Sequence, residues 1–272
     1  MNVLDALVLG VVQGATEFLP VSSSGHLVLI PEFFNIPAPT LGFDILVHLA
    51  TLVAVVGYFM GDVVKIVVSI VAPKRMERTE VVYWRRLFLW LVIGTVPAAL
   101  AGVLFGSFFE GLFSSTLAVG IFLVVTCLLL TGADAVLDRM RRRIEGLGRM
   151  RAQDALIIGF YQALAIAPGV SRSGATICAG IFLGFDRPTA ARFSFLLSIP
   201  VILGAFLVNL GDISMAFAGA DGLAYVVGAI SAAVSGFLAV SFLMRYLSRH
   251  RLRVFAVYTA VVGVIVIVLS LI

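Results

Sequence analysis

The sequence predicts an all-α integral membrane protein, with about six transmembrane helices and two re-entrant helical hairpins in an inverted-topology repeat. Three observations support this prediction: an apolar composition, long apolar runs and an internal repeat. Of the 272 residues, 61% are hydrophobic and only 12% are charged, whereas soluble domains carry about a quarter charged residues. We therefore expect a lipid bilayer, rather than a soluble core, to cover most of the apolar surface.

Six segments are long and apolar enough to cross a bilayer as helices. They are residues 41–60, 87–107, 114–138, 188–210, 220–243 and 253–272. Their apolar residues do not alternate with polar ones as in the strands of a membrane barrel, so helices are favoured. The start of the chain lacks the basic region of a signal peptide and leads into a polar motif, so we expect it to belong to the fold.

The basic residues are concentrated in three short segments. Residues 61–86, 139–151 and 245–253 together hold 16 of the 19 Lys and Arg. This distribution follows the positive-inside rule, so all three segments are predicted to be cytoplasmic and close to anionic headgroups. It also argues against nucleic acid as a partner, although the net charge is +4.

An internal repeat relates two polar motifs. Residues 13–26, QGATEFLPVSSSGH, align without gaps with residues 162–175, QALAIAPGVSRSGA, at an offset of 149. Gly-Phe-Asp then recurs at 42–44 and 184–186. We predict a single polytopic domain over residues 1–272, with a first repeat over about 1–110 and an inverted second repeat over about 150–243.

The side on which the basic segments lie predicts two re-entrant hairpins. If residues 139–151 and 245–253 are on one side, an even number of crossings must lie between them. The spans 188–210 and 220–243 already supply two, so residues 152–185 must enter the membrane and return to the same side. A break at Pro168 and Gly169 would allow this. Residues 1–34 are predicted to enter from the opposite side and to break at Pro20, so that the two tips meet near mid-membrane. A full crossing by residues 1–34 is the alternative.

The hairpin tips are predicted to bind an anion. A half-helix that starts at each tip points free N–H groups and its positive dipole end into the membrane, where they attract phosphate above all. Arg172 adds a planar fork of donors. The hydroxyl donors expected beside it are Ser22, Ser24, Ser171, Ser173 and Thr176. An arginine at mid-membrane costs about 3 kcal/mol, so a binding role is favoured over a snorkelling or purely structural arginine.

Glu17 is the second costly residue, and it follows Gln13 by one helical turn. A carboxylate near phosphate is repelled unless a cation lies between them. Glu17 and the amide oxygen of Gln13 could hold a hard divalent cation, Mg²⁺ or Ca²⁺. A structural ion pair between Glu17 and Arg172 is the alternative.

His26 follows Ser22 and Ser23 within one helical turn. A hydroxyl and an imidazole at this spacing can act as nucleophile and base, or as phosphate ligand and base. A buried core histidine is the alternative. His48 has no such neighbours and is interpreted as structural, and His250 lies in a basic segment, where we expect it near solvent or headgroups.

These motifs resemble those of undecaprenyl-diphosphate phosphatases of the bacitracin-resistance type. Gln13 to Glu17 matches the family's [E/Q]-x-x-x-E pattern, and Pro168 to Thr176 matches Pro-Gly-x-Ser-Arg-Ser-x-x-Thr. The resemblance covers nearly the whole chain. It implies hydrolysis of undecaprenyl diphosphate to the monophosphate and inorganic phosphate, dependent on Mg²⁺ or Ca²⁺, which recycles the carrier lipid of cell-wall synthesis. The glutamine at position 13 leaves one carboxylate in the first motif rather than two, which weakens a metal role there.

The resemblance also implies a polyisoprenyl diphosphate lipid as substrate, a multi-pass location in the bacterial cell membrane, and a site open to the extracytoplasmic face. It places Glu17, Ser23, His26 and Arg172 at the active site, with Ser171, Ser173 and Thr176 lining the phosphate site. Two mechanisms stay open. Ser23 could be a nucleophile with His26 as base, or His26 could activate water while Ser23 only binds.

Two further alternatives follow from the architecture. Inverted repeats with broken helices are more often transporters, so a transporter or flippase of a lipid phosphate or another anion is the competing function. Release of inorganic phosphate by the protein in detergent would distinguish a phosphatase from a transporter or flippase. The small-residue run at 228–239 could pack against a second copy in a homodimer or inside the chain, and the internal packing is favoured.

Overall fold

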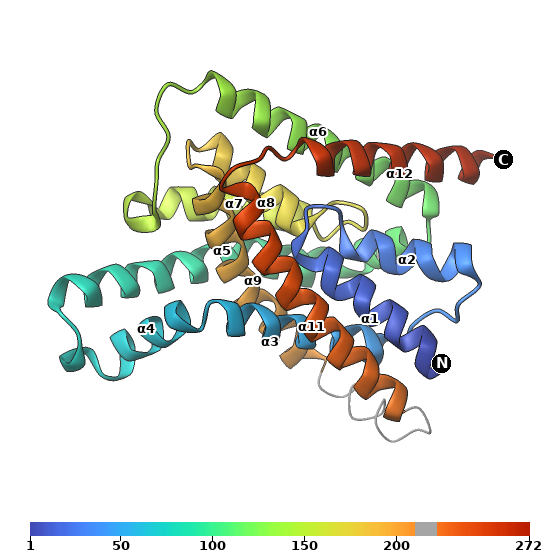
Figure 1. Ribbon diagram of the computed structural model, residues 1–272, viewed down its shortest axis with the longest axis horizontal. Coiled ribbons are helices and arrows are strands. Elements are labelled where there is room, and N and C mark those ends of the chain that lie inside the picture. Colours follow the sequence, from blue (N-terminus) through green and yellow to red (C-terminus); the bar gives the residue numbers. More distant parts are fainter. Residues whose placement is uncertain (210–221) are drawn as a thin grey trace.

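The computed structural model describes residues 1–209 and 222–272, and its secondary structure in these ranges is helical (Figure 1). Two single-turn 3₁₀ segments, Pro73–Arg75 and Leu147–Arg149, lie in the basic segments. The α-helices are α1 (Val3–Phe18), α2 (Ser23–Phe34), α3 (Leu41–Tyr58), α4 (Met60–Val71), α5 (Arg78–Phe113), α6 (Thr116–Arg139), α7 (Ala152–Leu164), α8 (Arg172–Phe182), α9 (Arg187–Val208), α11 (Gly222–Leu247) and α12 (Arg253–Leu271).

The six predicted spans are confirmed. Helices α3, α5, α6, α9, α11 and α12 are long and apolar enough to cross a membrane. Of the predicted span ends, residues 210, 220 and 221 lie outside the described residues. Helix α5 differs most from its predicted limits: it is 36 residues long and bends at Phe105, where φ is −124° and ψ is 18°. Its basic first two turns are helical, although they are too polar to have been counted in an apolar run.

Two helix pairs, α1–α2 and α7–α8, form hairpins whose helices are too short to cross a bilayer. They are 16, 12, 13 and 11 residues long, whereas about 20 residues are needed. The breaks contain Pro20 in the first hairpin and Pro168 and Gly169 in the second, as predicted. In Figure 1 the first hairpin opens toward the side of the N-terminus and the second toward the opposite side, so their tips point at one another.

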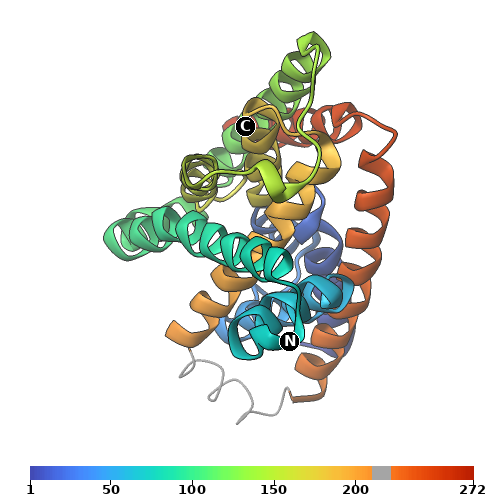
Figure 2. The ribbon, with the colours of Figure 1, turned by 90° about the vertical axis from the view of Figure 1, so that its left-hand side faces the viewer.

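The basic segments 61–86 and 139–151 lie at the left of Figure 1, and this end faces the viewer in Figure 2. The segment 245–253 lies nearer the middle of Figure 1, at the left end of α12. The two termini lie toward the other end in Figure 1. The predicted positive-inside topology requires the basic segments to share one side. The assignment of that side to the cytoplasm stays a prediction.

The helices of the two halves pack against each other in a reciprocal manner. Helix α1 lies against α11 and α7 lies against α5, while α6 pairs with α12. Gly10 on α1 faces the α11 backbone at Gly228, and Gly159 on α7 faces Pro97 on α5; these two glycines are 149 residues apart in the sequence. The small-residue run at 228–239 is therefore used for packing inside the chain. The exact repeat boundaries stay a prediction.

Candidate active site

The two hairpin tips are capped in the same way. Ser22 caps α2 and accepts a hydrogen bond from the backbone N–H of Gly25 at 3.3 Å. Ser171, which is 149 residues later, caps α8 and accepts from the N–H of Gly174 at 3.0 Å. Both cap hydroxyls also contact the serine two positions on, at 3.2 Å in the first tip and 3.1 Å in the second. Each tip thus starts a helix whose first N–H groups point toward the other hairpin.

The tips touch each other through glycines. A Cβ atom placed on Gly25 would lie 3.4 Å from the Cα of Gly169, and one placed on Gly174 would lie 3.4 Å from the Cβ of Pro20. The Ser173 hydroxyl also donates to the carbonyl of Leu19 at 3.1 Å. Gly169 has a φ of +98°, which a residue with a side chain adopts only under strain. Small residues at these positions therefore allow the backbones of the two halves to meet.

Glu17 occupies the centre of this contact. It is 7% exposed and ends α1 just before the first tip. Its Oε1 accepts from the Arg172 guanidinium, and its Oε2 accepts from the Ser23 hydroxyl at 2.6 Å and from the Gln13 amide at 3.0 Å. A buried carboxylate with this many donors is fully compensated in charge and in hydrogen bonding.

Arg172 is the first residue of α8 and has only one half of its guanidinium engaged. Its Nη2 donates to Glu17, while its Nη1 is buried and has no hydrogen-bond partner among the described residues. An unpaired buried donor on a charged group is costly. Arg172 lines a cavity together with the tip serines, where an anion could accept a hydrogen bond from this group.

Two cavities meet at the pair of Glu17 and Arg172. The smaller, of about 120 Å³, is lined by the tip serines 22–24 and 171. The larger, of about 510 Å³, shares Glu17, Ser24 and Arg172 with the first and continues along apolar side chains of α2, α3, α5 and α9. The residues of that apolar part include Leu27, Leu41, Ile45, Phe113, Ile202 and Phe206. The arrangement is a polar chamber with an apolar vestibule, which suits an anionic head on a long apolar tail.

Two of the predicted phosphate ligands point away from the chamber. Thr176 lies one turn into α8, where its hydroxyl donates to the Arg172 carbonyl at 2.8 Å and contacts the Ser194 hydroxyl at 2.6 Å. Ser173 uses its hydroxyl on Leu19 and Ser171. The structure therefore places both side chains behind the tips, where they hold the loops in position. Ser22, Ser23, Ser24 and Ser171 line the smaller cavity.

His26 lines neither of the two cavities, and two groups hold its ring in place. Its Nδ1 lies 2.7 Å from the Ser22 carbonyl and its Nε2 lies 2.7 Å from the Tyr258 hydroxyl on α12. Because a carbonyl only accepts, Nδ1 carries the proton and Nε2 accepts from Tyr258. The Ser23 hydroxyl, for which His26 was one of the possible bases, donates to Glu17. In this arrangement the base nearest to Ser23 is the carboxylate.

His48, interpreted from the sequence as structural, lines both cavities. Its Nε2 lies 3.7 Å from Glu17 Oε2, and its Nδ1 donates to the Asp44 carbonyl at 2.7 Å. Asp44 also lines the larger cavity. The only signal in the sequence was that Asp44 and His48 are four residues apart on a span of otherwise apolar character.

The chamber offers few ligands for a resident metal ion. Among the described residues, no group of three or more His, Cys, Asp and Glu side chains could hold a metal. Glu17 supplies one carboxylate, and the Gln13 Oε1 atom is buried without a partner in the described structure. Mg²⁺ is commonly held by one or two carboxylates together with substrate phosphates and water. These residues thus fit an ion that binds together with a phosphate group.

Fold and site together define a polytopic membrane protein with a polar chamber between two helical hairpins. The chain matches the family described as bacitracin resistance protein BacA over residues 6–265. It belongs to this family, which confirms the resemblance seen in its motifs.

Curated relatives cover almost the full length of the chain. It is 43% identical to an undecaprenyl-diphosphatase of Moorella thermoacetica over 267 residues, which is 98% of this chain and 97% of the relative. It is 42% identical to an undecaprenyl-diphosphatase of Thermomicrobium roseum over 273 residues, 97% of each chain. A third undecaprenyl-diphosphatase, of Pelotomaculum thermopropionicum, is 43% identical over 270 residues, 99% of this chain and 97% of that one.

Proposed function

We propose that this protein hydrolyses undecaprenyl diphosphate to undecaprenyl phosphate and inorganic phosphate, and so recycles the carrier lipid of cell-wall synthesis. The observation that carries the proposal is the partly buried, half-engaged guanidinium of Arg172 beside Glu17, at the junction of a polar chamber and an apolar vestibule. Membership of the family and the names of its relatives support the same activity.

The diphosphate head is proposed to bind in the chamber and the polyisoprenyl tail in the vestibule. The free Nη1 of Arg172 and the first N–H groups of α2 and α8 would hold the terminal phosphate, since phosphoryl transfer is catalysed mainly by positioning and neutralisation of charge. The tail would follow the apolar side chains toward the bilayer, so that the lipid does not have to leave the membrane.

The geometry around Ser23 supports two chemical routes. In the first, the Ser23 oxygen attacks the terminal phosphorus, its proton passes to Glu17 over 2.6 Å, and the bridging P–O bond breaks to release undecaprenyl phosphate. Glu17 passes this proton to the departing undecaprenyl phosphate and is a base again. Water then attacks the phosphoserine and gives a proton to Glu17, the bond between Ser23 and phosphorus breaks, and Glu17 returns the proton to the Ser23 oxygen as inorganic phosphate is released. In the second, Glu17 takes the proton from a water molecule that attacks the terminal phosphorus directly, the bridging P–O bond breaks, and the proton passes from Glu17 to the undecaprenyl phosphate that leaves. His26 would then support the site by fixing the α2 tip.

A divalent cation, Mg²⁺ or Ca²⁺, is proposed to bind with the substrate, held by Glu17 and the Gln13 amide oxygen. Such an ion supplies charge neutralisation at the phosphate oxygens. Binding can be measured without turnover, by titrating Mn²⁺ as a paramagnetic probe into protein saturated with a non-hydrolysable diphosphate analogue. The expected result is binding that requires the analogue and is lost in Glu17→Gln. Tight binding without the analogue would contradict the proposal.

The vestibule is proposed to open on the extracytoplasmic side of the bacterial cell membrane. Its walls include the start of α3 at Leu41 and the end of α5 at Phe113. In Figure 1 both helix ends lie away from the basic segments. Because basic segments mark the cytoplasmic side, the opposite end would face outward.

The decisive experiment is phosphate release by purified protein in detergent, with undecaprenyl diphosphate and Mg²⁺. Detergent removes compartments, so a transporter or flippase would release no phosphate. Release by the wild type and its loss in Arg172→Gln would support the proposed reaction. No release by folded wild-type protein would contradict it.

A further inference from the structure

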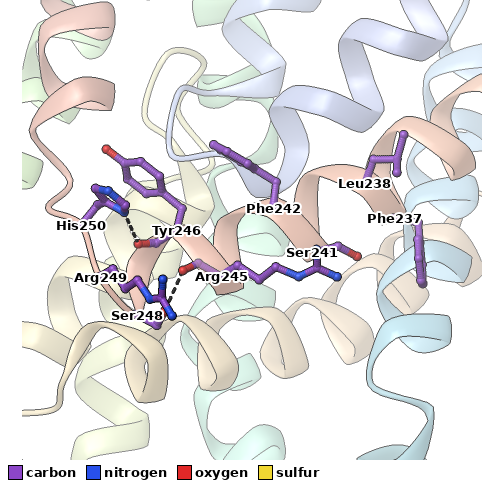
Figure 3. A pocket seen from close by; sticks show the side chains of 9 residues that line it. All are labelled: Phe237, Leu238, Ser241, Phe242, Arg245, Tyr246, Ser248, Arg249 and His250. Carbon is purple, nitrogen blue, oxygen red and sulfur yellow. Dashed lines mark hydrogen bonds between the residues drawn. The ribbon is translucent and has the colours of Figure 1, made fainter.

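A groove runs along the C-terminal part of α11, far from the residues of the chamber. It has a volume of about 860 Å³ and is formed by residues 237–250 alone. Figure 3 shows its polarity: Phe237 and Leu238 lie at one end, and Arg249 and His250 lie at the other. None of its lining residues lines the two cavities at Glu17.

The groove holds two arginines without acidic partners: Arg249 lies at the end with His250, and the Arg245 side chain extends from the middle toward Ser241 (Figure 3). Arg245 and Arg249 line it, no Asp or Glu does, and neither arginine forms an ion pair within residues 1–209 and 222–272. By contrast, the nearby Arg251 pairs with Asp138 at 3.2 Å. The groove therefore has an uncompensated positive charge.

The last carbonyls of α11 do not need these arginines as caps. The Tyr246 carbonyl accepts from the backbone N–H of His250 at 2.8 Å, and the Arg245 carbonyl accepts from the Ser248 hydroxyl at 2.6 Å. Since local groups already satisfy these acceptors, the two guanidinium groups remain available to a ligand.

The dimensions of the groove match one leaflet of a bilayer. Phe237 and Arg249 are twelve residues apart, which corresponds to about 18 Å along a helix, and half of a hydrocarbon core is about 15 Å. One wall is a row of rings: Phe242 lies 5.5 Å from Tyr246, and Tyr246 stacks on His250 at 4.6 Å. The basic end of the groove belongs to the segment 245–253, one of the three basic segments.

We propose that this groove binds one anionic glycerophospholipid from the leaflet at the basic end. Its phosphate contacts Arg249, the exposed Arg245 side chain turns from its position beside Ser241 to contact the same phosphate, and one acyl chain lies along Phe242, Leu238 and Phe237. The charge of the groove selects an anionic headgroup, because a zwitterionic lipid would bring its own cation close to the two arginines. The apolar end then distinguishes a lipid from a free phosphate ion.

Native mass spectrometry of the full-length protein in detergent tests this proposal. Phosphatidylglycerol and phosphatidylcholine with identical chains are added in equal amounts. The wild type is expected to bind the anionic lipid about tenfold more tightly. The double variant Arg245→Gln/Arg249→Gln should lose this preference, whereas Arg142→Gln/Arg143→Gln, which removes the same charge from another basic segment, should keep it.

Two further measurements test whether the lipid binds in the groove itself, rather than through a general attraction of anions to the basic segments. Phe242→Ala, with both arginines kept, should weaken binding of phosphatidylglycerol several-fold. Inorganic phosphate is added as a competitor, and it should not displace the phospholipid at equal concentration because it has no apolar chain. Any of four results would overturn the proposal. These are an equal loss of the preference in both arginine variants, equal binding of the two phospholipids by the wild type, an unchanged affinity of Phe242→Ala for phosphatidylglycerol, or displacement of the phospholipid by the competitor. All substituted side chains are exposed, and an unchanged unfolding midpoint checks the fold.

Discussion

Ser23 and Arg172 occupy equivalent positions in the two halves of the chain, and both donate to the carboxylate of Glu17. The Ser23 hydroxyl reaches Oε2 at 2.6 Å, and the Arg172 guanidinium reaches Oε1. The two residues are 149 positions apart, and each is the first residue of its tip helix. The repeat has thus diverged at one position, where one copy supplies a hydroxyl and the other a positive charge around a shared acid.

The pair of Glu17 and Arg172 should be strongly coupled in stability. Arg172→Gln leaves a buried carboxylate without its counter-charge, which is expected to cost about 3–5 kcal/mol of unfolding free energy. The double variant Glu17→Gln/Arg172→Gln removes both charges and should recover part of this loss. Chemical unfolding in detergent measures both, and a double variant less stable than the single one would contradict the coupling. Phosphate release by Arg172→Gln should fall about 10²–10³-fold, since a charged donor to phosphate is lost.

Ser23 should matter far more than its neighbour Ser24. The Ser23 hydroxyl donates to Glu17, whereas that of Ser24 contacts only the cap hydroxyl of Ser22. If Ser23 is the nucleophile, Ser23→Ala should lower turnover about 10²–10⁴-fold, because alanine lacks the oxygen that attacks the phosphorus. Ser24→Ala serves as the matched control, with a decrease below about tenfold. Mass spectrometry of quenched single-turnover reactions should detect phosphate on Ser23; its absence, with Ser23→Ala still active, would favour direct attack by water.

His48 should contribute modestly by supporting Glu17 from the side of α3. Its Nε2 lies 3.7 Å from the carboxylate, and a contact of this kind at a partly exposed side chain contributes about 1 kcal/mol or less. We expect His48→Ala to lower kcat/KM up to about fivefold, and His48→Gln, which keeps a donor at the cavity wall, to lower it less. Steady-state kinetics on both variants checks the order, and equal values for the two would argue that the imidazole only fills space.

Tyr258 should stabilise the first tip through His26. Its hydroxyl donates to Nε2 at 2.7 Å, and single hydrogen bonds between membrane helices contribute about 0.6 kcal/mol on average. Tyr258→Phe should lower the unfolding free energy by about this amount and leave phosphate release within a factor of a few. Tyr58→Phe is the control, because the hydroxyl of Tyr58 has no partner among the described residues. A loss of turnover of 10²-fold or more in Tyr258→Phe alone would instead assign the His26 ring a direct part in the chemistry.

Gly169 should not tolerate a side chain. Its φ is +98°, and a Cβ would lie 2.9 Å from the Cβ of Phe122 and still closer to the Val119 carbonyl. Gly169→Ala is expected to destabilise the protein by more than about 1 kcal/mol. Gly57→Ala is the control, because a Cβ there meets no atom within 4 Å. Similar unfolding midpoints for the two variants would show that the second tip can relax.

The sequence was sufficient to predict the spans, the hairpins and the central pair of Glu17 and Arg172. These features depend on apolar length, on chain-breaking residues and on the cost of charge in a membrane, all of which are local properties. The role of His48 could not be predicted, because its neighbour Glu17 comes from another helix and only the packing of α1 on α3 brings them together. The directions of Thr176 and Ser173 likewise depend on which side of α8 faces the first tip, and the repeat alone does not specify this.

The reciprocal packing of the two halves has a consequence for biosynthesis. The first hairpin leaves the ribosome early, yet the helix on which it rests, α11, is among the last to be made. Until α11 has been made, α1 lacks the helix against which it packs, and the tip around Glu17 is not held in position. The active site can therefore assemble only after the second half of the chain has been synthesised. If the chain is divided within the segment 139–151, the two fragments produced together should release inorganic phosphate, whereas neither fragment should do so alone.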